Sequence, residues 1–296
     1  MENDPEWINH KYFRTYRIAD ILTSFARGSS SFIDMEGFHA SEGILEMIPS
    51  WQKDTLVHKL AKIVAHQIFL NDTNGPYVKI YKPEESFQPK RYLPVDLALQ
   101  AYGIEHTLFE VPPPDGEVVR ISQNMTTWQE FPRAANACYD YFLEDLSPSQ
   151  VYDDLLSRMA DEVFHVVFRD RVTMRDLNAY FSMYVEKISE KLEMLDMETQ
   201  DNFTKKGTLK RKGILTWVKR AVFFREQGRC ASCGMNITGL LDAIPNEQFD
   251  HIIPLADFGL NDLSNIQLLC KPCNLHKSAS RSDTSDRYRR WYRAQK

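Results

Sequence analysis

Residues 270–277 read CKPCNLHK, and the cysteine pair in this stretch has a counterpart upstream in CASCG at residues 230–234. Each pair has the spacing C-x-x-C, which can direct two thiolates toward one metal ion. Zinc prefers four ligands in a tetrahedron, and four thiolates leave no position open for water. The two stretches therefore predict a structural zinc site made by Cys230, Cys233, Cys270 and Cys273. Such a site would hold together a module whose core is too thin to fold alone.

The composition places this site in an ordinary globular protein. The 296 residues are 43% hydrophobic and 26% charged, which is typical of chains that bury real cores. No apolar run approaches the roughly 18–20 residues of a membrane span, and the acidic start MENDPEWINH lacks the layout of a signal peptide. We expect a cytoplasmic protein without a membrane partner, in which reduced thiols favour zinc over disulfides. The fifth cysteine, Cys138, is predicted to be a small buried hydrophobe.

Charge is distributed unevenly along the chain. From residue 205 onward there are 17 Lys and Arg against 8 Asp and Glu, a net charge of +9. The chain totals of 36 and 41 leave 19 against 33 before that point, a net charge of −14. A basic region suits a polyanionic partner, and nucleic acid is the commonest one. The acidic region would either shield that basic surface or bind a protein partner.

Helical patterns dominate the chain before residue 230. Helices are predicted over residues 50–70, from Thr173 to about Met197, and over residues 214–227 with a stop at Gly228. Two short strands are expected in residues 106–122. The basic stretch 200–213 is interpreted as a linker or as an arm on a phosphate backbone. We therefore expect a mostly α protein with a small α+β module. Its parts would be an acidic helical domain (1–200), a basic linker (201–213) and a zinc-containing domain with a basic tail (214–296).

Four stretches taken together resemble the HNH endonucleases, the ββα-metal nucleases, in their four-cysteine zinc-containing form. They are CASCG (230–234), FDHIIPL (249–255), NIQLLC (265–270) and CKPCNLHK (270–277), and they follow one another in the family's order with ordinary spacing. The resemblance covers roughly residues 214–282. It implies a ββα-metal fold, DNA as the substrate, and a catalytic divalent cation in addition to the structural zinc.

Hydrolysis of a phosphodiester needs a base for the attacking water and a cation for the charge that develops. His251 is the candidate base because imidazole titrates near neutral pH, and Asp250 is the candidate oxygen ligand for Mg²⁺ or a similar ion. By the resemblance, Asn274 supplies a second ligand at a position where the family name implies histidine. Asn265 would hold the loop that carries His251 through backbone hydrogen bonds.

Two further residues are expected to bind phosphate. At about 100° per residue, Lys277 lies on the same helical face as Asn274, whereas His276 faces elsewhere. Lys277 would hold the scissile phosphate or its neighbour. Arg281 opens a C-terminal stretch (281–296) in which arginines alternate with aromatic residues, a composition that suits phosphate contact and base stacking. A basic helix packed on the domain by its aromatic side chains is the alternative.

The sequence thus predicts an HNH-type DNA endonuclease that nicks one strand per site with little sequence specificity. By analogy, its acidic N-terminal region would regulate it within a bacterial anti-phage or restriction system. Two other functions stay open: a non-catalytic zinc module that binds nucleic acid, and a ribonuclease centred on Arg158 and His165. The spacing of that pair resembles the motif of the HEPN ribonucleases, although an amphipathic helix with an incidental pair explains it more simply.

Overall fold

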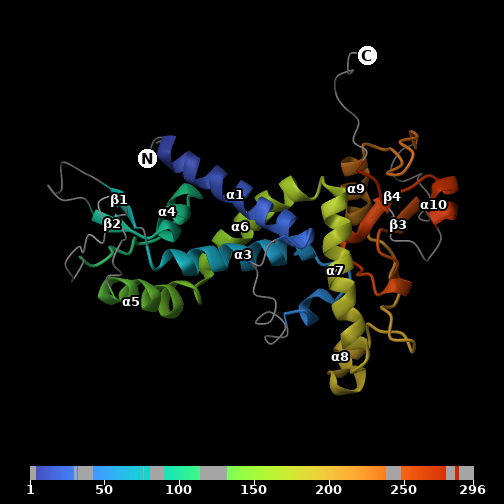
Figure 1. The fold of residues 1–296 in the computed structure, drawn as a ribbon, viewed down its shortest axis with the longest axis horizontal. Helices are drawn as coiled ribbons and strands as arrows, with labels where there is room; N and C mark the ends of the chain where they lie inside the picture. The colour runs from blue at the N-terminus through green and yellow to red at the C-terminus, as the bar shows by residue number, and fades with distance from the viewer. Residues whose placement is uncertain are drawn as a thin grey trace, which may run out of the picture. The chain divides into compact units, whose positions relative to one another are not determined.

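The computed structural model describes residues 5–29, 32, 43–75, 77–80, 90–113, 132–237, 248–277 and 284–286, and this part of the chain is mostly helical (Figure 1). Its helices are α1 (Pro5–Ala26), α3 (Leu56–Asp72), α4 (Pro94–Ala101), α5 (Pro132–Asp140), α6 (Gln150–Val167), α7 (Arg171–Ser189), α8 (Met197–Gln200), α9 (Thr216–Glu226) and α10 (Lys271–Lys277). Its strands are β1 (Val78–Ile80), β2 (Lys90–Tyr92), β3 (Phe249–His251) and β4 (Ile266–Leu268). Both sheets have two antiparallel strands, β1 with β2 and β3 with β4.

The chain forms two compact units. One contains Met1–Asp20 and Leu60–Val163, and the other contains Ile21–Lys59 and Phe164–Lys296. Residues 201–213 and all four clustered cysteines fall within the second unit, together with a segment from the first sixty residues. The boundaries of these units differ from those of the three parts expected from the sequence (1–200, 201–213 and 214–296). That division into domains stays a prediction.

The predicted helices occur with shifted ends. The apolar pattern at residues 50–70 belongs to α3, where Leu56, Leu60, Val64 and Ile68 are all buried. The helix expected from Thr173 begins earlier, because the carboxylate of Asp170 accepts hydrogen bonds from the first backbone N–H groups of α7, and it ends at Ser189. Of the strands expected in residues 106–122, residues 106–113 are described and contain one isolated bridge, between Glu110 and Tyr92.

In the second unit, β3 and β4 lie beside α9 and α10 (Figure 1). Phe249 pairs with Leu268, Asp250 with Gln267, and His251 with Ile266. Phe249 and His251 are buried on one face of β3, whereas Asp250, pointing to the other face, is partly exposed, as the two-residue period of a strand requires.

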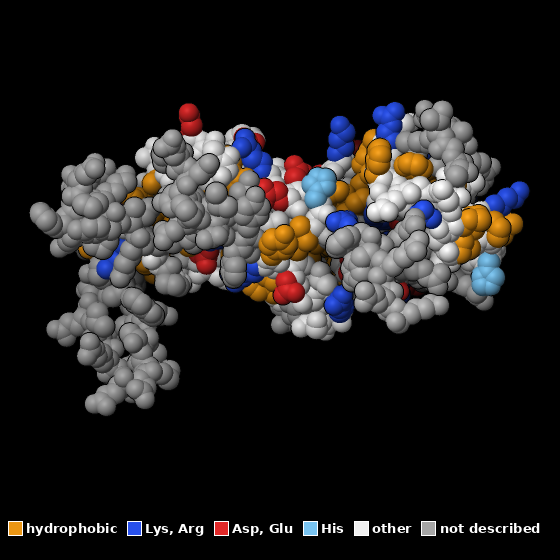
Figure 2. Space-filling model, turned by 90° about the horizontal axis from the view of Figure 1, so that it is seen from above, with side chains coloured by type: hydrophobic (Ala, Val, Ile, Leu, Met, Phe, Trp, Pro, Cys, Tyr) orange, Lys and Arg blue, Asp and Glu red, His pale blue; other side chains and the backbone are white. Residues whose placement is uncertain are grey.

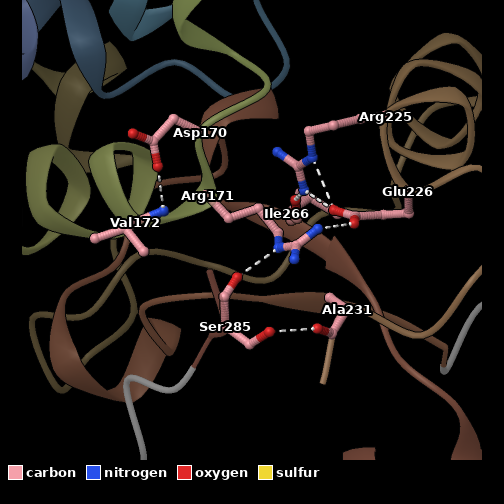
Figure 3. A network of polar contacts seen from close by, with 8 residues as sticks. All are labelled: Asp170, Arg171, Val172, Arg225, Glu226, Ala231, Ile266 and Ser285. Carbon is pink, nitrogen blue, oxygen red and sulfur yellow. Dashed lines mark hydrogen bonds and ion pairs between the residues drawn. The ribbon is translucent and has the colours of Figure 1, made fainter. Parts of the chain in front are cut away.

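A buried polar network fixes the surroundings of this sheet (Figure 3). Arg171, at the start of α7, donates to the carboxylate of Glu226 in α9 and to the carbonyl of Ser285. Arg225 donates to the other oxygen of Glu226 and to the carbonyl of Ile266 in β4. The side chains of Arg171, Arg225 and Glu226 are at most 4% exposed. Since removal of one partner from a buried pair typically costs about 3–5 kcal/mol, α7, α9, β4 and residues 284–286 are held as one assembly.

The surface carries both charged and hydrophobic side chains. On the face drawn in Figure 2, Lys and Arg side chains project beside exposed hydrophobic side chains. Among the described residues, the exposed large hydrophobic side chains include Phe224 at 72% and Leu215 at 46%. Within the described ranges, none of the helices combines the length and the apolar character needed to cross a membrane.

Candidate active site and metal centre

The four cysteines of the two C-x-x-C pairs converge in the structure. The ligand atoms of Cys230, Cys233, Cys270 and Cys273 all lie within 4.8 Å of one another, and the sulfurs of Cys233 and Cys270 are 3.7 Å apart. A tetrahedron with Zn–S bonds of ~2.3 Å has sulfurs separated by about 3.8 Å. The spacing of the cluster therefore fits zinc, and all five cysteines of the chain are free of disulfides.

Local structure explains how these cysteines meet. The first pair forms a turn in which the N–H of Gly234 donates to the carbonyl of Cys230, with Gly234 at a left-handed φ of 75°. The second pair begins α10, where the N–H of Asn274 donates to the carbonyl of Cys270. The N–H of Ala231 donates to the carbonyl of Leu268 at 2.8 Å, which ties the first turn to the end of β4.

The electrostatics of the cluster also favour a cation. Burial, followed by side-chain contacts with the other cysteines, raises the pKa of the Cys270 thiol to about 12. Sulfurs this close cannot all ionise by themselves, because thiolates repel one another. A divalent cation removes that repulsion and deprotonates its thiol ligands. The cluster can thus hold a zinc ion with a closed set of ligands.

His251 is the last residue of β3, and its protonation follows from its neighbours. Its Nε2 lies 3.2 Å from Oδ1 of Asn261. Nδ2 of Asn261 donates to the carbonyl of Lys210 at 2.9 Å, which turns the carboxamide oxygen toward the imidazole. Because that oxygen can only accept, Nε2 of His251 carries the proton and Nδ1 keeps a lone pair. Within the described residues, Nδ1 has no hydrogen-bond partner.

The imidazole of His251 is also shielded from water. The residue is 2% exposed, and the ring centroid of Trp51 lies 6.1 Å from its own. Burial, followed by the positive charge of Arg211, lowers the pKa of His251 to about 4. The imidazole is therefore neutral at pH 7 with an unprotonated Nδ1, and its pKa lies below the near-neutral value expected from the sequence.

Asp250 is paired with a lysine from α10. The ammonium of Lys277 donates to Oδ2 of Asp250 at 2.8 Å and to the carbonyl of His251 at 2.6 Å. Lys277 is 4% exposed, and the side chain of Asp250 is 21% exposed. The lysine predicted to bind phosphate thus supplies a positive charge directly to the predicted metal ligand, and its contact with phosphate stays a prediction.

Asn274 is the second residue that was predicted to bind the catalytic cation. Asn274 lies one turn before Lys277 and is partly buried on α10, so both occupy the same face of the helix. Apart from the cysteines, no group of three or more Cys, His, Asp or Glu ligand atoms gathers in the described part of the chain. The binding of a divalent cation by Asp250 and Asn274 therefore stays a prediction; a carboxylate and a carboxamide are oxygen ligands of the kind that Mg²⁺ takes.

Asn265 fixes the loop that follows His251. Its Oδ1 accepts from the N–H of Ile253 at 2.8 Å, and its Nδ2 donates to the carbonyls of Ile253 and Leu260 at 3.0 and 2.9 Å. The loop is tight enough that a Cβ at Gly259 would lie 2.0 Å from the carbonyl oxygen of Ile253. These are the kind of backbone hydrogen bonds expected of Asn265, whose importance for a reaction stays a prediction.

Contacts from distant segments hold the same loop. The N–H of Leu56, at the start of α3, donates to Oδ2 of Asp262, a residue 206 positions away. Nδ2 of Asn178 in α7 donates to the hydroxyl of Ser264 at 2.9 Å. Asp262 in turn accepts from the N–H and hydroxyl of Ser264. The loop between β3 and β4 is therefore positioned by α3 and α7 as well as by its own sequence.

The remaining predicted residues lie apart from this arrangement or beyond the described ranges. His276 is exposed on α10, as its helical position suggested. Arg281 lies outside the described residues. On α6, Arg158 and His165 are both exposed, and the guanidinium of Arg158 donates to the carbonyl of Tyr102.

Two residues beside His251 were missed by sequence reasoning. Asn261 belongs to no sequence motif, because it bonds the imidazole of His251, ten residues away, and the carbonyl of Lys210, 51 residues away. Trp51 lies within the stretch 50–70 that was predicted to be helical, but the helix begins only at Leu56. The backbone N–H of Trp51 donates to the carbonyl of Asn261, and its backbone has an unusual φ of 57°. A bulky residue in this left-handed conformation is rare and marks a site of local strain. The single usable signal in the sequence was a tryptophan just ahead of the α3 pattern.

Comparison with known proteins agrees with this geometry. Residues 230–280 match the family described as HNH endonuclease. No curated protein and no solved structure matches the chain. The matched range includes the cysteine cluster, His251, Asp250 and Asn265. The resemblance expected from the sequence is confirmed for this range, and residues 230–280 form an HNH endonuclease domain.

Proposed function

We propose that this chain is a metal-dependent DNA endonuclease of HNH type, with a zinc-stabilised ββα-metal fold. The observation that best supports the proposal is the arrangement of β3 and α10. It combines a neutral His251 whose Nδ1 carries a lone pair with an Asp250 carboxylate on the preceding residue and a lysine charge beside it. A module that only binds nucleic acid has no need of a buried, oriented imidazole.

In the proposed reaction, Nδ1 of His251 takes a proton from water while the water oxygen forms a bond to phosphorus. The bond between phosphorus and the leaving oxygen breaks, and that oxygen is then protonated by solvent. Asp250 and Asn274 would hold the divalent cation, which neutralises charge on the phosphate and leaving oxygen. Asn261 keeps the proton of His251 on Nε2, and Asn265 keeps the loop in place.

Several finer features belong to this proposal. One site cuts one strand, so a single chain nicks duplex DNA. No residue in the described ranges forms a recognisable base-reading element, so cleavage has little sequence specificity. Regulation by the acidic N-terminal region and a place in anti-phage defence or restriction stay predictions.

The test is nicking of supercoiled plasmid by the purified full chain loaded with zinc, with and without added Mg²⁺. We expect nicking only with Mg²⁺, and His251→Ala lowers its rate by roughly 10²- to 10⁴-fold, the usual contribution of a general base. His276→Ala is the matched control, because that histidine is exposed on α10. The metal-free reaction omits Mg²⁺ rather than adding EDTA, since EDTA also competes for zinc. Wild-type nicking by His251→Ala would disprove the assignment of the base.

The ribonuclease alternative is tested by repeating the same reactions with RNA as the substrate. A site built on Arg158 and His165 would cleave RNA without Mg²⁺, and its activity would survive His251→Ala. We expect no such cleavage.

A further inference from the structure

Residues 202–212 form an ordered turn in the second unit, where the sequence left a linker and a phosphate-binding arm as alternatives. Phe203 and Leu209 pair in an isolated antiparallel bridge and are 4% and 2% exposed. The N–H of Thr204 donates to the carbonyl of Thr208 at 2.8 Å. Gly207 turns the chain with a φ of 79°. Buried anchors on both sides of a closed turn are not the features of a loose linker. We name residues 204–212 the basic turn.

The basic turn carries a concentration of positive charge without counter-charges. Lys205, Lys206, Arg211 and Lys212 are all exposed. Within the described residues, none of the four makes a salt bridge. With Lys210, five cations lie within eight positions and repel one another, and an external polyanion relieves that repulsion. Successive phosphates of a DNA strand offer such an array of negative charge.

The basic turn is also connected to the candidate base. The carbonyl of Lys210 accepts from Nδ2 of Asn261 at 2.9 Å, and Oδ1 of Asn261 faces Nε2 of His251 at 3.2 Å. One carboxamide therefore separates the backbone of the turn from the imidazole. A phosphate backbone bound along the turn would pass beside the site.

We infer that the basic turn is the DNA-binding edge of the nuclease site, where Lys205, Lys206, Arg211 and Lys212 contact backbone phosphates of duplex DNA. This inference rests on the proposed function and deepens it, because it names the surface that brings the substrate to His251. It also explains why the carbonyl of Lys210 is used to orient Asn261. The segment that binds the substrate is the segment that sets the proton position on the base.

The experiment measures binding of a fluorescent DNA duplex to the full, zinc-loaded chain by anisotropy, without Mg²⁺, over a range of salt concentrations. Wild type is compared with two double variants and with the quadruple variant that combines them. The first double variant is Lys205→Gln with Lys206→Gln, and the second is Arg211→Gln with Lys212→Gln. Each neutralised phosphate contact reduces the slope of log K against log[salt] by about 0.9. We expect each double variant to lose about 2 in slope, and the quadruple variant about 4 with affinity lower by roughly 10²- to 10³-fold at 0.1 M salt.

The control makes the same change in charge elsewhere. Arg17→Gln with Lys90→Gln removes two cations from the first compact unit, of which Arg17 is exposed and Lys90, paired with Glu110, has a side chain that is 40% exposed. This variant should leave slope and affinity unchanged. The thermal midpoint of every variant is measured, because the glutamines replace exposed side chains and should not alter folding.

Plasmid nicking by wild type tests the proposed function separately. If wild type nicks while the quadruple variant keeps its affinity and slope for DNA, the inference is wrong and the proposed function stands. If the quadruple variant loses affinity for an RNA duplex of equal length but keeps its affinity for DNA, the assignment to DNA is wrong. If wild type binds DNA through the turn but does not nick, the surface is supported and the proposed function fails.

Discussion

The cysteine cluster and the surroundings of His251 share one small domain, but different kinds of contact assemble them. The cluster draws all its ligands from two C-x-x-C turns, whose spacing alone brings two sulfurs together. His251 depends on Asn261, which depends on the carbonyl of Lys210, 51 residues away, and on packing with Trp51. Each half of the cluster is therefore local, whereas the candidate base depends entirely on tertiary structure. Substitutions in the cysteine cluster should unfold the domain. Substitutions around His251 should change the nicking rate while the domain stays folded.

The largest effect should come from losing the metal centre. Apparent binding energies of structural zinc, about 10–16 kcal/mol, equal or exceed the whole stability of a typical domain, about 5–15 kcal/mol. We expect one zinc per chain by elemental analysis, and we expect Cys270→Ala to lose the zinc, unfold residues 230–280 and abolish nicking.

Cys138→Ala is the matched control, because Cys138 is equally buried but lies outside the cluster. It should keep its zinc. Wild-type protein that contains no zinc, or a Cys270→Ala chain with unchanged thermal midpoint, would show that the cluster does not organise the domain.

Asn261→Leu tests the other half of the comparison. It removes the acceptor that holds the proton of His251 on Nε2, so both neutral tautomers should become populated. Outer partners that orient a functional histidine typically contribute 10- to 100-fold, and we expect nicking to slow by roughly that factor. Long-range ¹H–¹⁵N NMR of the imidazole nitrogens reports the tautomer directly, independently of activity.

Asn178→Leu controls for the loss of a buried asparagine. Asn178 is 0% exposed and its Nδ2 donates to Ser264 in the same loop and to the carbonyl of Met174, not to His251. It should lower stability and leave the tautomer unchanged. A wild-type tautomer in Asn261→Leu would mean that the imidazole is oriented by something other than Asn261.

This contrast also explains what the sequence could predict. The zinc ligands and the α3 helix were accessible because they depend on spacings of three or four residues. Asp250, His251 and Asn265 were accessible through the family pattern. Asn261 and Trp51 were not, since a polar residue bound to a distant carbonyl leaves no periodic trace. The contact of Lys277 with Asp250 was missed for a related reason: a helical wheel gives the face of a residue but not its partner across the sheet.

The smallest expected effect concerns the indole of Trp51. It tests whether Trp51 supports His251 by the packing of its ring or by a hydrogen bond from its indole N–H. Nε1 of Trp51 is buried without a partner among the described residues, and the residue is 7% exposed. Trp51→Phe keeps an aromatic ring against His251 and keeps the backbone bond to Asn261. The small cavity it leaves is offset by removal of an unsatisfied donor, so stability should change by less than about 1 kcal/mol.

Trp51→Ala, by contrast, removes the ring and should cost about 3–5 kcal/mol. If Trp51 acts through its shape, Trp51→Phe nicks plasmid within about twofold of wild type, because the polar contacts of His251 remain intact. The decisive measurement is the nicking rate of Trp51→Phe beside its thermal midpoint. A rate that falls tenfold or more at unchanged stability would make the indole N–H a donor to the substrate, and Trp51 would then join His251 in contacting the reacting groups rather than covering them.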